Sequence, residues 1–119
     1  MLWSWGANSY GQLGLGTVSE QEETPRPVTT GVECEQIVGG GGHTVMLDSG
    51  GGLHVTGWNN VGQLGLGHTD QVLEFTPLEL SETVTQVSAG WDFTLVLTES
   101  GQVYSCGNNS FGQLGRLLL

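Results

Sequence analysis

The chain has 119 residues, enough for one ordinary domain, and glycine fills 21 of these positions. Only 3 residues are proline and 37% are apolar, which argues against both a collagen helix and a disordered chain. Twelve acidic residues face two basic ones, and the net charge of -10 argues against nucleic-acid binding and against an anionic membrane surface. These features favour a β-rich fold whose tight turns require glycine.

One short string recurs through the chain and defines a repeat. Gly-Gln-Leu-Gly begins at positions 11, 62 and 112, at a nearly constant spacing. The segments between the copies align as well, since 44–47 matches 94–97, 51–57 matches 101–107, and 2–6 continues the latter match backwards. We therefore divide the chain into the end of a partial repeat (1–17), a repeat (18–67), a second repeat (68–115) and a divergent tail (116–119). A unit of about 50 residues is typical of propellers, solenoids and repeat arrays.

Short apolar or β-branched runs predict the strands of each unit. They cover 35–38, 44–47 and 53–56 in one unit, and 85–88, 93–98 and 103–106 in the next. Hairpin turns are predicted at 48–52 and 99–102, and a segment near Pro27 or Pro77 predicts a fourth, outermost strand. No window has a sustained helical period. Four short strands per unit without crossover helices predict an all-β fold of β-propeller blades.

The repeat resembles a known family. Gly-x-Asn-x-x-Gly-Gln-Leu-Gly-x-Gly, a later proline, Gly-x-x-His-Thr and Asp-x-Gly-x-Val-Tyr-x-x-Gly are similar to the repeat of the regulator of chromosome condensation family. The resemblance covers residues 2–115. It implies a seven-bladed β-propeller, of which about two and a third units are present here. Family members often promote nucleotide exchange on a small Ras-related GTPase.

Two departures from the family pattern shape the expectations. Position 43 is histidine, as the pattern asks, but the equivalent position in the next unit is Phe93. After Gly115 the expected Leu-Gly is replaced by residues 116–119, which suggests a truncated product, a partial gene model or an alternative transcript. Stacked repeats with uncapped ends expose strand edges, and we expect missing blades or another chain to cover them.

Residue patterns for catalysis, cofactors or metals are missing from the sequence. There is no lysine for a Walker loop, and the glycines at 39–42 complete no dinucleotide-binding fingerprint. His43, His54 and His68 lack metal-ligand spacing, and His43 is expected to have a hydrogen-bonded packing role. We therefore expect no enzyme chemistry, no catalytic residue, no cofactor and no metal.

Three residues are candidates for protein contact. Trp91 and Asp92 interrupt the pattern between two predicted strands, in a loop that propellers present at one rim, and Trp58 is a similar case. A tryptophan beside an acid suits a protein interface, because tryptophan is enriched at binding hot spots. The alternative is that Trp91 packs between blades.

The residues and the resemblance together lead to one functional expectation. The chain is expected to be part of a propeller similar to guanine nucleotide exchange factors, acting through contact with a small GTPase or another protein. A non-catalytic interaction scaffold and a truncated, non-functional fragment are the alternatives. We expect no nucleic-acid and no membrane partner, and a cytoplasmic location with the nucleus as a second possibility.

Overall fold

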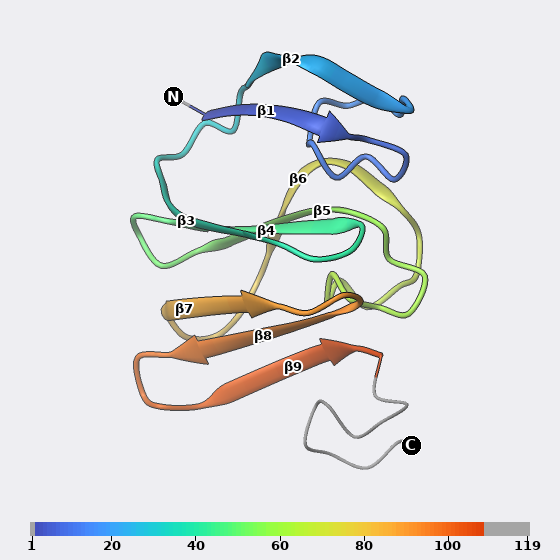
Figure 1. Cartoon of the computed structure of the whole chain (residues 1–119). Coiled ribbons are helices and arrows are strands. Elements are labelled where there is room, and N and C mark those ends of the chain that lie inside the picture. The colour runs from blue at the N-terminus through green and yellow to red at the C-terminus, as the bar shows by residue number, and fades with distance from the viewer. Residues whose placement is uncertain (1, 109–119) are drawn as a thin grey trace.

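The computed structural model describes residues 2–108, and within that range every regular element is a β-strand (Figure 1). The strands in this range form three antiparallel sheets. No helix there is long and apolar enough to cross a membrane. The all-β class is therefore confirmed. The third Gly-Gln-Leu-Gly copy and the 116–119 tail lie outside the described residues.

Within each sheet, strands adjacent in the sequence pair with each other, so the second and third sheets are meanders and the first is a two-stranded sheet. The first sheet contains β1 (Leu2–Ala7) and β2 (Gln21–Val28). The second contains β3 (Cys34–Gly39), β4 (His43–Asp48), β5 (Leu53–Gly57) and β6 (Val72–Leu78), and the third contains β7 (Val84–Ala89), β8 (Phe93–Thr98) and β9 (Val103–Gly107). The six strands predicted at the two aligned sets of runs are confirmed, with bounds that differ by one residue at most.

The second sheet has four strands, in the order β3-β4-β5-β6. At its centre Val45 of β4 lies opposite Val55 of β5, and both side chains are fully buried. Pro77 lies in β6, opposite His54, and β6 is the outermost strand. Its position at the edge tolerates a residue without a backbone N–H. The predicted fourth strand is thus confirmed, and β2 carries Pro27 in the same way.

The Gly-Gln-Leu-Gly string forms a corner that joins the third and fourth strands of one sheet. Strands β3 to β5 precede the second corner, whereas β6 follows it. The 18–67 period of the sequence and the second sheet, which spans residues 34–78, therefore overlap without coinciding. A sheet of this kind begins in one sequence unit and is completed by the start of the next.

A buried asparagine holds each described corner together. Asn59 accepts a hydrogen bond from the Leu64 amide at 3.0 Å and donates to the carbonyls of His68 and Asp70 at 2.8 and 3.1 Å. Asn8 accepts from the Leu13 amide in the first corner. The corner glycines have positive φ angles, a conformation that other residues rarely adopt. The repeated Asn and Gly residues are therefore explained by the hydrogen bonds and backbone angles that the corner requires.

The hydrophobic core lies where the second and third sheets meet. Leu64 of the corner is fully buried there, and it packs with residues of β4, β5, β7 and β8. Burying such a side chain contributes about 2 kcal/mol to folding. The members of this core are Val45, Leu47, Leu53, Val55, Leu64, Val84, Val87 and Val96. The core fixes neighbouring sheets face to face and so fixes the loops at their ends.

Candidate functional site

Loops at one end of the three sheets carry all the residues predicted to contact a protein. In Figure 1 the β3–β4 turn, the β5–β6 connection and the β7–β8 turn lie at the right-hand end. Trp58 begins the β5–β6 connection, and Trp91 and Asp92 lie between β7 and β8. Alternate connections of a meander return to the same end, which is why residues far apart in sequence gather here.

Two aromatic rings stack across the boundary between the first and second sheets. The rings of Tyr10 and Trp58 have centroids 4.4 Å apart and planes 12° apart. Gly42 lies against both, because a methyl group placed on it would be 2.8 Å from the Tyr10 ring and 3.2 Å from Trp58. The Trp58 amide also donates to the Gly42 carbonyl at 2.8 Å. The stack therefore requires a residue without a side chain at position 42.

Trp91 extends this arrangement to the third sheet. The Gly41 amide donates to the Trp91 carbonyl at 2.7 Å, and a methyl group on Gly41 would lie 2.5 Å from the indole. Even so, Trp91 is 72% exposed. Its indole rests on the Gly41 backbone, and most of its surface faces solvent. We call Tyr10, Trp58 and Trp91, together with Gly41 and Gly42, the aromatic strip.

Asp92 is fixed beside the strip by its neighbour at the end of β9. The Asn108 side-chain amide donates to Asp92 Oδ2 at 2.8 Å, and the Asn108 backbone amide donates to the Asp92 carbonyl at 3.0 Å. A carboxylate can accept several hydrogen bonds, so a further donor can be accommodated next to Asn108. The arrangement holds a negative charge adjacent to an exposed indole.

Beneath the strip, a hydrogen-bonded relay ties the second sheet to the third. The Thr94 hydroxyl of β8 donates to the Gln63 carbonyl at 2.7 Å, and it lies 2.9 Å from His43 Nε2. Because a hydroxyl has only one proton, His43 Nε2 is assigned as the donor to Thr94. In the preceding corner Thr44 donates to the Gln12 carbonyl at 2.7 Å, which repeats the hydroxyl contact without a histidine. The predicted packing role of His43 is confirmed.

His43 is fully buried, and its surroundings favour the uncharged imidazole. Burial lowers its pKa, against smaller raising effects of the Phe93 backbone and of the Asp92 charge. Its Nδ1 has no hydrogen-bond partner among residues 2–108. A proton on this ring would therefore place a charge at the seam between two sheets.

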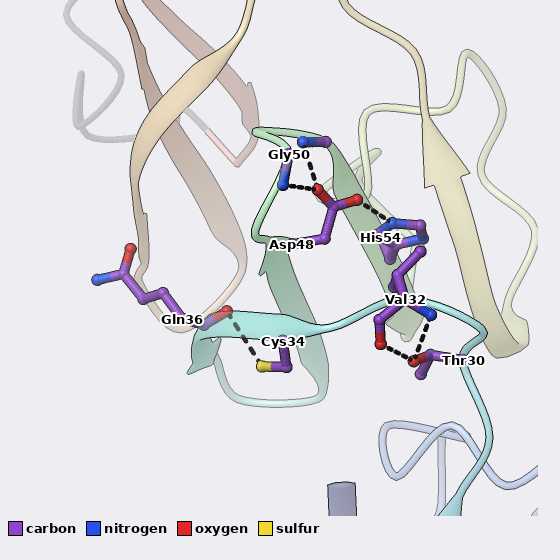
Figure 2. A network of polar contacts seen from close by, with 8 residues as sticks. Thr30, Val32, Cys34, Gln36, Asp48, Gly50 and His54 are labelled. Carbon is purple, nitrogen blue, oxygen red and sulfur yellow. Dashed lines mark hydrogen bonds and ion pairs between the residues drawn. The ribbon is translucent and has the colours of Figure 1, made fainter. Parts of the chain in front are cut away.

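The opposite end of the second sheet holds a separate polar network (Figure 2). His54 Nε2 lies 2.8 Å from Asp48 Oδ2, and the Gly50 and Gly52 amides donate to Asp48 Oδ1 at 2.8 and 3.0 Å. The pKa of Asp48 is lowered mainly by its hydrogen bond with His54 and, to a smaller extent, by the hydrogen bond from the Gly52 amide. These contacts fix the β4–β5 turn. Spacing in the sequence did not reveal the pair, because Asp48 and His54 meet only when the hairpin closes.

Residues 2–108 contain no group of three or more histidine, cysteine or acidic side chains placed to hold a metal ion. The aromatic strip, with Asp92, is the candidate site because it combines a cross-sheet ring stack with an exposed tryptophan and a carboxylate. Sequence reasoning identified Trp58, Trp91 and Asp92 for it but missed Tyr10. The signal for Tyr10 is weak, since the matching residue of the next corner is Val61.

The described residues form one four-stranded meander between a two-stranded and a three-stranded sheet, with corner loops gathered at one end, as in the blades of a β-propeller. The model of the regulator of chromosome condensation (RCC1) repeat matches residues 1–47 and 50–97, and a second model of the same description matches 84–113. The chain belongs to this repeat family. The resemblance derived from the motifs is thereby confirmed.

Known proteins support both the family and the fold. The secretion-regulating guanine nucleotide exchange factor of Bos taurus is 53% identical over 96% of this chain. The chain spans 25% of that relative's length. The crystal structure of human WBSCR16 superposes with a TM-score of 0.84 at 30% identity, over 95% of this chain and 30% of the other. Prp20p of Saccharomyces cerevisiae, the yeast RCC1, superposes with a TM-score of 0.82 at 23% identity, over 95% of this chain and 30% of the other.

Proposed function

We propose that this chain is a section of a guanine nucleotide exchange factor for a small Ras-related GTPase. The observation that carries the proposal is the 53% identity, over 96% of the chain, with a relative named as a secretion-regulating guanine nucleotide exchange factor. Exchange of this kind needs no covalent catalyst, so it is compatible with a site made of aromatic rings and one carboxylate.

The aromatic strip is the surface through which this chain would act. Trp91 offers the large exposed side chain typical of an interface hot spot. A GTPase loses its nucleotide faster when a partner binds the nucleotide-free form more tightly than the loaded form. The strip would contribute to that difference by contacting elements that move when the nucleotide leaves.

Nucleotide release tests the proposal directly. Because the chain spans a quarter of its relative, we would use a chimera in which it replaces the matching segment of the Bos taurus protein. The chimera is incubated with a panel of small GTPases loaded with a fluorescent guanine nucleotide. We expect faster release from at least one GTPase, and no acceleration across the panel would contradict the proposal.

The same experiment separates exchange from scaffolding, the alternative left by the sequence. A scaffold would bind a GTPase or another protein through the strip and leave the release rate unchanged. Binding and release are therefore measured on the same samples, with binding followed by sedimentation. Binding without acceleration would favour the scaffold.

A further inference from the structure

The aromatic strip has a floor without side chains. Residues 39–42 are all glycine, but added methyl groups at 40, 41 and 42 would meet other residues of this chain within 2.8 Å, so only Gly39 of the four is open to a partner. At Gly39 an added methyl group would meet nothing within 4 Å, which leaves open space in front of that residue. Trp91 stands on this floor with most of its indole exposed, and Asp92 follows it in the chain. A mostly exposed planar ring and a carboxylate are thus adjacent in the β7–β8 turn.

The charged side chains in the connections around the strip are negative. The connections that surround the strip carry the carboxylates of Glu20, Asp70 and Asp92, and their described residues include neither lysine nor arginine. The one basic residue of the described range, Arg26, lies in β2 and pairs with Glu22 at 2.6 Å. His43 lies below the strip, where its burial favours the neutral ring. A partner that binds here therefore meets negative charge that no neighbouring lysine or arginine among residues 2–108 offsets.

An arginine side chain can contact both the Trp91 indole and the Asp92 carboxylate. The guanidinium of arginine is planar and stacks on indole, and it also forms a forked pair with a carboxylate. Lysine offers a compact ammonium without the planar stacking face, and an apolar side chain would add no donor to the one that Asn108 already gives Asp92.

We propose that Trp91 and Asp92 bind an arginine of the partner protein. The inference deepens the proposed function, because it names the chemical group by which the partner is held. It rests on a protein partner binding at this end of the sheets, and it requires no exchange activity.

A peptide pair tests this inference without any GTPase. The probe is a fluorescein-labelled Gly-Ser peptide with three arginines. The control peptide carries citrulline, a neutral group of the same shape, at those positions. Fluorescence anisotropy gives both dissociation constants for the whole chain. We expect the arginine peptide to bind roughly tenfold more tightly, as a stacked and paired guanidinium would.

Variants at the two ends of the sheets give the control. Trp91→Leu and Asp92→Asn are each expected to remove most of the preference for arginine. Glu99→Gln changes the net charge as much as Asp92→Asn, but it lies in the exposed β8–β9 turn at the opposite end, so the preference should stay. Trp91→Phe keeps a stacking face and should retain part of it.

The inference is overturned if Glu99→Gln and Asp92→Asn lower the affinity equally, since net charge alone would then explain binding. It is also overturned if Trp91→Leu leaves the preference for arginine intact. Nucleotide release by the chimera is a separate measurement. Loss of exchange activity with intact arginine binding would remove the proposed function and leave this inference standing, and the reverse result would remove the inference alone.

Discussion

The hydrogen bonds under the aromatic strip predict that replacing threonine by valine lowers the stability of the fold more at Thr94 than at Thr44. Thr94 and Thr44 occupy equivalent places in β8 and β4, and each donates a 2.7 Å hydrogen bond to a corner carbonyl. Thr94 also accepts from His43 and is 2% exposed, whereas Thr44 is only partly buried. Thr94→Val keeps the side-chain shape but leaves the His43 Nε2–H without its partner. The Gln63 carbonyl then has only the weaker Cys106 Sγ–H donor, at 3.3 Å.

The expected loss of folding free energy follows from the hydrogen bonds that Thr94→Val removes. A buried polar group that loses its partner costs about 1–3 kcal/mol. One such group, the His43 N–H, together with about 1 kcal/mol for the lost hydroxyl bond to the Gln63 carbonyl, predicts a loss of about 2–4 kcal/mol for Thr94→Val. Thr44→Val should cost roughly 1 kcal/mol, because one partner is affected and water is nearer. Losses of this size are large against the stability of a small domain.

A double-mutant cycle isolates the part that belongs to His43. His43→Phe copies the residue that the chain itself has at position 93, and it removes the N–H that Thr94→Val would strand. The double variant should therefore lose less than the sum of the single losses, by about 1 kcal/mol or more. Urea unfolding followed by tryptophan fluorescence measures all four species. Equal losses for Thr94→Val and Thr44→Val, or strict additivity in the cycle, would refute the reasoning.

Two further predictions concern the same region. The lowered pKa of His43 means that the unfolded chain binds a proton more readily, so stability should fall as pH drops below about 6.5. In urea melts across this range His43→Phe should reduce that loss, and an unchanged pH slope would speak against it. Gly41→Ala should displace the Trp91 indole and shift its fluorescence emission, while Gly39→Ala, which meets no neighbour, should leave the spectrum unchanged. Equal spectra for the two variants would contradict the described packing.

The repeat explains why so much of the fold could be predicted from the sequence. Because 44–47 aligns with 94–97, the sequence contains two copies of the same strand pattern, and each copy supports the prediction made from the other. The two strands, β4 and β8, occupy matching places in their sheets. The proline segments identified the outer strands, because a missing amide is tolerated only at an edge. Local chemistry and periodicity were sufficient for these elements.

The site was less accessible to sequence reasoning because its contacts join distant residues. Tyr10 and Trp58 stack although 47 residues separate them in the chain. The exposure of Trp91 depends on how its loop rests on Gly41, and a pattern of residue types leaves both packing and exposure open. The pairing of His54 with Asp48 likewise depends on closure of a hairpin.

The most direct test of the account is the effect of Trp91→Ala on nucleotide release by the chimera. The matched control is Ser49→Ala, an exposed position in the β4–β5 turn at the other end of the sheet. Loss of a hot-spot tryptophan costs about 2 kcal/mol or more, so the rate of release should fall roughly thirtyfold at limiting chimera concentration. The account predicts that fall for Trp91→Ala and an unchanged rate for Ser49→Ala, and equal rates for both variants would contradict it.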